Sequence, residues 1–282
     1  MQKAFILSLF LASGLHAATW EAEVKAAVKL QRQGNLKAAE ETLMRAQLEA
    51  ERFGASDARA AYTLDYLGTL YMQEGAKDEA LAVFAKALKG FDSSLGADSS
   101  EASESAKRLA EAYEADQQWD KAEPLYRRLL EQTRKNEKAE PLSLAESISD
   151  LAFSLDAQKK WDEALPLYDE ALVIRKKALG EDAAEVAETI NNQARIWLLK
   201  GDAPKSIGLF RQALAIDEKA LGKDHATVAD DLRRLAAATR KSGKEMDAIP
   251  MESRAQAIED KAAAAAEKKN GPSPKPVPLP KS

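Results

Sequence analysis

The chain has 282 residues, a formal net charge of -5 and no cysteine. This composition excludes a fold that depends on disulfides or on a thiolate-bound metal, and its acidic balance opposes non-specific binding to nucleic acid or anionic lipid. Because hydrophobic residues make up 45% of the chain and glycine is sparse, we expect an all-α fold with a sizeable core.

The first residues have the layout of a secretory signal peptide. An early lysine precedes the apolar run 4–11, and small residues follow at Ala17 and Ala18. The run is shorter than the roughly 20 residues that span a bilayer, so we expect no membrane span after cleavage. We predict a cleaved signal peptide over residues 1–17, with cleavage after Ala18 as the alternative. A buried N-terminal helix is the competing interpretation, whereas a cleaved chain would be periplasmic or secreted.

The chain then repeats itself at intervals of 42 residues. The phrase "QQWDKAEPLY" at 117–126 returns as "KKWDEALPLY" at 159–168. The same interval relates pairs of a small residue and an aromatic residue four positions later, namely Ala80/Phe84, Ala122/Tyr126, Ala164/Tyr168 and Ser206/Phe210. It also relates three leucines that each precede a small residue, Leu67, Leu109 and Leu151. Such spacings place large and small residues on one helical stripe, so each unit is predicted to hold two helices.

The ends of these helices carry their own signals. Asp78, Asp120 and Asp162 are predicted N-caps of the second helices, because a short carboxylate can accept from the free amides of a first turn. The dipeptide "LG" recurs at 95, 179 and 221, and its glycine predicts a left-handed stop. The stretch "RKNEKAEP" at 134–141 replaces this stop, so any bend in the array is expected there.

The leucine, glycine and tyrosine at 67, 68 and 71, followed by alanine and an aromatic residue on the next helix, resemble the tetratricopeptide repeat. The length of 42 residues, the "LG" stop and the phrase "TINNQARIW" at 189–197 look like the repeats of kinesin light chain and its bacterial relatives. The resemblance implies a right-handed superhelical α-solenoid of about six helix pairs over residues 19–269, ending in an extended capping helix.

Residues 270–282 include "GPSPKPVPLPKS", a proline-rich tail that cannot join a helix. We predict that this tail is disordered. The alternative is a docking peptide for a groove.

Few residues suit catalysis. The chain has two histidines, His16 in the leader and His225, which we interpret as a cap or a hydrogen-bonding linker residue. No nucleophile motif, phosphate loop or dinucleotide fingerprint is present in the sequence, so we expect no enzyme activity, no cofactor and no metal. Trp119 and Trp161 are interpreted as staples against a neighbouring helix, with partner anchoring as the alternative.

The resemblance implies that a segment of another protein binds the concave face of the array. The residues that it places on this face are Tyr62, Asp65, Lys107, Phe153, Asn191, Arg195, Arg233 and Arg240. Asn191 is expected to pair with a peptide backbone, and Arg195 with Arg233 to hold an acidic segment. The alternative for the arginines is a solvated basic face.

These observations predict a non-catalytic scaffold that assembles or positions an envelope complex through a bound protein or peptide segment. Two other interpretations stay open: a self-associating structural module that forms homo-oligomers, and an accessory subunit of an exported enzyme. Nucleic acid is not an expected partner.

Overall fold

The computed structural model describes residues 19–54 and 56–270, and every regular element in these ranges is an α-helix. The predictions on the signal peptide at 1–17 and on the tail after 270 therefore lie outside the described residues. The first helix covers 19–32. The others are α2 (Leu36–Glu51), α3 (Arg59–Glu74), α4 (Lys77–Ser94), α5 (Ser100–Ala115), α6 (Trp119–Lys135), α7 (Pro141–Ala157), α8 (Trp161–Leu179), α9 (Ala184–Leu199), α10 (Ala203–Ala220), α11 (Ala226–Lys241) and α12 (Glu245–Asn270).

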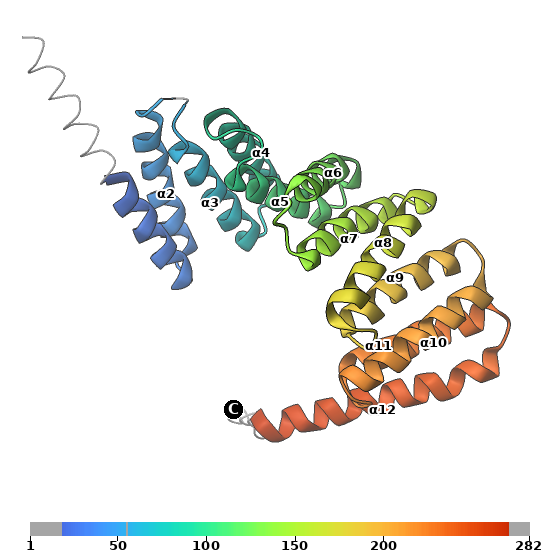
Figure 1. The fold of residues 1–282 in the computed structure, drawn as a ribbon. Coiled ribbons are helices and arrows are strands. Elements are labelled where there is room, and N and C mark those ends of the chain that lie inside the picture. Colours follow the sequence, from blue (N-terminus) through green and yellow to red (C-terminus); the bar gives the residue numbers. More distant parts are fainter. Residues whose placement is uncertain (1–18, 55, 271–282) are drawn as a thin grey trace, which may run out of the picture. The chain divides into compact units, whose positions relative to one another are not determined.

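The described helices form six antiparallel pairs, and the chain divides into two units (Figure 1). Unit 1 ends at Glu137 and contains the first helix with α2, α3 with α4, and α5 with α6. Unit 2 begins at Lys138 and contains α7 with α8, α9 with α10, and α11 with α12. The predicted all-α repeat of two helices is confirmed. The division falls inside 134–141, the stretch that lacks the "LG" stop.

Small residues at fixed repeat positions let the helices of each unit approach closely. Gly68 of α3 lies against the ring of Phe84 on α4, and a Cβ at Gly68 would lie only 2.6 Å from that ring. In unit 2 the equivalent residue is Ala152 of α7, which is buried in the same core as Tyr168 of α8. Because helices of this length are marginal alone, burial of these stripes against neighbouring helices stabilises the fold.

In the second and third hairpins, a side chain of the second helix is matched to the residue twelve positions earlier on the first helix. Phe84 belongs to an apolar cluster that includes Met72. In the next hairpin the Tyr126 hydroxyl donates a hydrogen bond to the Glu114 carboxylate over 2.7 Å. An apolar ring therefore faces an apolar side chain, whereas a phenol faces an acid.

Unit 2 follows the same rule. The hydroxyl of Tyr168 is buried, and the pKa of Tyr168 is raised first by this burial and then by the negative charge of Asp156. The last hairpin has Glu252 at the aromatic position, and Arg240 twelve residues earlier forms an ion pair with it. The departure of the last repeat from the pattern is thus compensated within its own hairpin.

One prediction about helix ends is wrong. The helices α4, α6 and α8 begin one residue before Asp78, Asp120 and Asp162, so each aspartate occupies the second helical position. No side-chain hydrogen bond caps these three helices. The carboxylates still lie at the positive end of the helix dipole, where a negative charge is favourable.

The interpretation of His225 as a cap is confirmed. His225 is the N-cap of α11, and its Nδ1 accepts a hydrogen bond from the backbone N–H of Thr227. Trp119 and Trp161 are the first residues of α6 and α8, and each is half-buried.

Left-handed residues occur at two kinds of turn. Gly96, Gly180 and Gly222 of the "LG" stops have φ of 93°, 93° and 92°. The turns inside the hairpins also need a positive φ, and two of them supply it without glycine, because Gln117 has φ 57° and Lys159 has φ 61°. A side chain in this conformation is strained.

Candidate functional site

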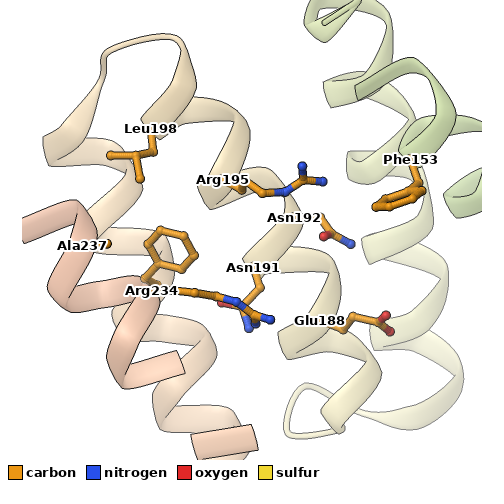
Figure 2. A pocket seen from close by; sticks show the side chains of 9 residues that line it. Phe153, Glu188, Asn191, Asn192, Arg195, Leu198, Arg234 and Ala237 are labelled. Atoms are coloured by element: carbon orange, nitrogen blue, oxygen red, sulfur yellow. The ribbon is translucent and has the colours of Figure 1, made fainter. Parts of the chain in front are cut away.

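Unit 2 has an open pocket of about 400 Å³ that extends across α7, α9 and α11 (Figure 2). We call it the unit 2 groove. The residues that line it are Phe153, Glu188, Asn191, Asn192, Arg195, Leu198, Phe210, Arg234 and Ala237.

Arg195 is held in the unit 2 groove by a buried carboxylate. Its Nη2 lies 2.5 Å from Oδ2 of Asp156, whose side chain is 0% exposed. The guanidinium also lies 5.7 Å from the ring centre of Phe153. Burial raises the pKa of Asp156, and the charge of Arg195 acts in the opposite direction. Because the Arg195 side chain is 41% exposed and has five N–H donors, it can also bind a group in the groove.

Arg234 is seated in a similar way on α11. Its Nη1 lies 3.3 Å from Oδ1 of Asp231, whose side chain is fully buried, whereas the Arg234 side chain is 51% exposed. The Nδ2 amide of Asn191 donates a hydrogen bond to the same Asp231 oxygen over 2.7 Å. Two arginines of the groove therefore rest on buried acids and keep about half of their side chains accessible.

Asp231 shares its buried position with Asp217 of α10. Burial raises the pKa of both carboxyls, and the hydrogen bond between the two side chains further raises that of Asp217, to about 7. Two adjacent carboxylates cannot both ionise cheaply, so we infer that the pair shares one proton below this pH. Arg234 on α11 and Glu188 on α9 are the charged groups that act on Asp217 from the neighbouring helices.

The structure brings three of the predicted unit 2 residues together and separates two others from them. Phe153, Asn191 and Arg195 line the unit 2 groove. Arg233 does not line it, because its Nε donates to Glu259 of α12 over 3.0 Å. Arg240 pairs with Glu245 over 2.8 Å and with Glu252, and is likewise not among the lining residues.

Asn191 is placed in the groove but is only 6% exposed, and Asp231 engages its amide nitrogen. The neighbouring Asn192 is the more exposed amide. In Figure 2 the Asn192 side chain extends from α9 on the same side as Arg195, toward Phe153. Asn192 and Arg234 are not among the groove residues predicted from the sequence, although they occupy equivalent positions, 42 residues apart, in successive repeats.

One repeat position lines a pocket in some repeats and not in others. Asp65 and Asn191 line pockets, whereas Lys107 and Arg233, which are related to them by multiples of the repeat interval, do not. Arg234 lines the groove where Arg233 was expected. In unit 1 Arg108 lines the concave pockets, whereas Lys107 does not.

Unit 1 has a smaller pocket of about 220 Å³ between α3 and α5, with Phe91 of α4 at its edge. We call it the tyrosine pocket. The residues that line it are Tyr62, Asp65, Tyr66, Phe91, Ser100, Glu101, Glu104 and Arg108. The predicted residues Tyr62 and Asp65 are both present.

Aromatic rings and carboxylates alternate around the tyrosine pocket. The Tyr62 ring meets Phe91 edge to face with centres 4.9 Å apart, and its hydroxyl donates to Glu101 over 3.1 Å. Burial is the main cause that raises the pKa of Tyr62, followed by the hydrogen bond to Glu101. Arg108 lies 2.9 Å from Asp65 and 3.2 Å from Glu104.

A second concave pocket of unit 1, of about 430 Å³, shares Asp65, Tyr66 and Arg108 with the tyrosine pocket. It extends to Gln31 and Gln73, whose amides are hydrogen-bonded to each other over 2.8 Å. The concave surface of unit 1 thus continues from α5 past α3 to the first helix.

The described residues were also searched for metal sites and membrane spans. Over 19–54 and 56–270, no group of three or more histidine or acidic side chains is placed to hold a metal ion. In the same ranges no helix combines the length and the apolar character that a bilayer crossing requires. The expected absence of cofactor and of catalysis stays a prediction.

Comparisons with known proteins identify the fold. A family model described as tetratricopeptide repeat matches residues 57–135 and 143–219. No match is found among curated protein sequences.

Three solved structures are similar in fold. Repeats described as nearly identical and TPR-like, assigned to a kinesin light chain of Podosopora anserina, share 22% identity at a TM-score of 0.61, covering 74% of this chain and 98% of that one. BtubC (BKLC) from P. vanneervenii shares 23% identity at a TM-score of 0.63, with coverages of 88% and 97%. The apo quorum sensor NprR from B. thuringiensis shares 14% identity at a TM-score of 0.62, with coverages of 84% and 64%.

At these identities the three structures support the fold, while the family model covers units 1 and 2 directly. The 42-residue interval and the helix pairs agree with both. The chain belongs to the tetratricopeptide-repeat family, and its fold is similar to that of kinesin-light-chain-like repeats.

Proposed function

We propose that this protein is a non-catalytic interaction scaffold that holds an extended, carboxylate-bearing segment of another protein in the unit 2 groove. Membership of the tetratricopeptide-repeat family supports a protein-interaction role in general. The observation that carries the narrower proposal is the pair Arg195 and Arg234, each seated on a buried aspartate and each about half exposed in one pocket.

Seating an arginine on a buried acid favours binding because it fixes the guanidinium before the partner arrives. A free arginine loses side-chain freedom when it forms a salt bridge, whereas Arg195 is already oriented by Asp156 and Phe153. The planar guanidinium can then present its remaining N–H groups to a carboxylate in a forked geometry.

The rest of the unit 2 groove suits a peptide more than a small ion. Leu198 of α9 and Phe153 of α7 offer apolar surface on the two sides of Arg195 in Figure 2. Asn192 between them can donate to and accept from a peptide backbone whatever the sequence of that peptide. A pocket volume of about 400 Å³ accommodates a few side chains of a bound segment.

The proposal can be tested at Ala237, an exposed residue of α11 that lines the groove one repeat after Arg195. A photoreactive amino acid at Asn192, introduced in source cells, would capture the native partner, and mass spectrometry would identify the crosslinked segment. We expect an acidic segment, whose crosslinking yield rises several-fold with Ala237→Lys and falls several-fold with Ala237→Glu.

Ala237 has no charged partner to lose, so both variants should fold, and circular dichroism would check this. A photoreactive residue at Gln212, exposed on α10 outside the groove, serves as the matched control. Equal yields from the lysine and glutamate variants, or equal capture from position 212, would contradict the proposal.

We also propose that the protein is exported and assembles or positions a complex of the cell envelope, on the basis of the signal-like residues 1–17. N-terminal sequencing of the chain isolated from cells tests this directly. A mature chain that begins at Ala18 or Thr19 supports export, whereas a chain that retains Met1 or Gln2 contradicts it.

A further inference from the structure

The tyrosine pocket of unit 1 differs in chemistry from the unit 2 groove and is not used by the proposed function. Its walls present three aromatic rings, those of Tyr62, Tyr66 and Phe91, within about 220 Å³. Tyr66 is 39% exposed, which leaves its ring available for contact. An accessible tyrosine ring that is backed by two further aromatic rings on a concave surface is a suitable site for a rigid apolar segment.

The charge of the tyrosine pocket is negative. Asp65, Glu101 and Glu104 supply three carboxylates against the single guanidinium of Arg108. Arg108 reaches two of them, at 2.9 Å and 3.2 Å, while Glu101 accepts from Tyr62 and from Ser100. A cation placed between the rings and these carboxylates would gain from both.

The chain itself contains a segment of complementary chemistry. Residues 271–282, outside the described part, read "GPSPKPVPLPKS", with proline at every second position from 272 to 280. The segment has two lysines, Lys275 and Lys281, and no acidic residue. Alternate prolines favour the extended polyproline II conformation, which loses little conformational freedom on binding and stacks its rings on aromatic side chains.

We propose that the tyrosine pocket binds residues 271–282 of this chain, with prolines against Tyr66 and Tyr62 and a lysine against Glu101 and Glu104. Twelve residues follow the end of α12, and in polyproline II they extend about 37 Å at roughly 3.1 Å per residue. The segment belongs to a second copy of this chain, so the contact joins two molecules.

The absence of cysteine gives a clean probe for this contact. Ser282→Cys creates one thiol, and a fluorophore attached there reports the mobility of the tail by its anisotropy in the full-length chain. We expect a high anisotropy that falls toward the free-dye value with Tyr66→Ala or Glu104→Lys. An excess of synthetic peptide 271–282 should lower it in the same way.

A charge exchange separates a specific contact from a general effect on the fold. Glu104→Lys alone should weaken the contact at least tenfold, and Lys275→Glu with Lys281→Glu should restore it, because the opposed charges are regained. Glu104 is an exposed residue that pairs with Arg108 on its own helix, so the fold should survive. Ala237→Glu in unit 2 serves as the control and should leave the anisotropy unchanged.

The concentration dependence tests the source of the segment. Because the segment belongs to a second copy, the anisotropy should rise with protein concentration together with the sedimentation coefficient. An anisotropy that is independent of concentration would contradict a contact between copies. An anisotropy at the free-dye value in the parent chain, or one unaffected by Tyr66→Ala, Glu104→Lys and added peptide, would overturn the proposal. Neither outcome bears on the unit 2 groove, so the two proposals fail separately.

Discussion

The concave pockets of unit 1 and unit 2 are built on the same repeat but differ in what lies at equivalent positions. Phe91 contributes an aromatic wall to the tyrosine pocket, whereas Asp217, three repeat intervals later, belongs to the buried acid pair under the unit 2 groove. Tyr66 faces the first pocket, and its counterparts Asn192 and Arg234 face the second. By contrast, the small residues at positions 68, 110, 152, 194 and 236 are glycine or alanine in each of these repeats. The packing residues of the repeat therefore stay similar from unit to unit, while the residues that line the pockets differ.

The largest effect on stability is expected at Asp156 and Glu114, which occupy equivalent repeat positions but differ in burial. Asp156→Ala should lower the free energy of unfolding by about 2–4 kcal/mol, because it leaves the guanidinium of Arg195 without its buried acid. Glu114→Ala at the equivalent place in unit 1 should lower it by about 1 kcal/mol, since Glu114 is only half-buried. Urea denaturation of both variants measures the difference, and equal losses would contradict the contrast.

Close packing in unit 1 should make it less tolerant of added volume. Gly68→Ala is expected to lower the free energy of unfolding by about 1–3 kcal/mol, because the new Cβ would lie 2.6 Å from the Phe84 ring. The reciprocal change in unit 2, Ala152→Gly, should cost about 1 kcal/mol through helix propensity alone. Thermal denaturation followed by circular dichroism tests both. An unchanged melting temperature for Gly68→Ala would show that α3 and α4 can move apart at little cost.

The buried acid pair should give unit 2 a distinctive dependence on pH. The folded pKa of Asp217, about 7, lies above the ordinary carboxyl value near 4, so folding retains a proton that the unfolded chain releases between about pH 4 and 7. This contribution to stability is full at low pH and is lost as the pH rises through 7. Asp217→Asn should therefore gain in melting temperature relative to the parent chain between pH 5 and pH 8.

The exposed neighbour of the pair supplies a matched control for this measurement. Asp230→Asn removes a carboxylate from the same helix as Asp231 but from its surface. Its melting temperature relative to the parent chain should change little over the same range. A flat difference for Asp217→Asn would show that the two aspartates do not share a proton.

The smallest effect concerns the strained turns on either side of the division. Gln117 follows the end of α5 in the last hairpin of unit 1, and Lys159 follows the end of α7 in the first hairpin of unit 2. Both residues have a positive φ. Replacing either with glycine should raise the free energy of unfolding by about 0.5–1 kcal/mol, because strain is relieved at a modest entropic cost. A loss of stability in urea would show that these side chains contribute more than their strain costs.

Much of the fold can be predicted from the sequence because the repeat signal is carried by small residues and rings that pack in every unit. The N-caps predicted at Asp78, Asp120 and Asp162 lie two residues after the observed caps, because an aspartate suits the second helical position as well as the cap.

The groove was predicted less well for two reasons. The repeat position of Asp65 and Asn191 does not line a pocket in every repeat, so Arg108 and Arg234 line the pockets where Lys107 and Arg233 were predicted. The burial of Asp156, Asp217 and Asp231 was not predicted, because an acidic residue on a helix is usually exposed to solvent. One signal in the sequence could have revealed Asp156. Met72 precedes Phe84 by twelve residues, whereas Glu114 and Asp156 precede Tyr126 and Tyr168 by the same interval, so an acid occurs where tyrosine replaces phenylalanine.

The most direct test of the claim that one repeat pattern carries two separate grooves combines two variants with two measurements. Ala237→Glu and Glu104→Lys would each be examined for partner crosslinking at position 192 and for anisotropy of a dye at position 282. The account predicts that Ala237→Glu lowers only the crosslinking and that Glu104→Lys lowers only the anisotropy. A loss of both signals in either folded variant, or of neither signal in both, would contradict it.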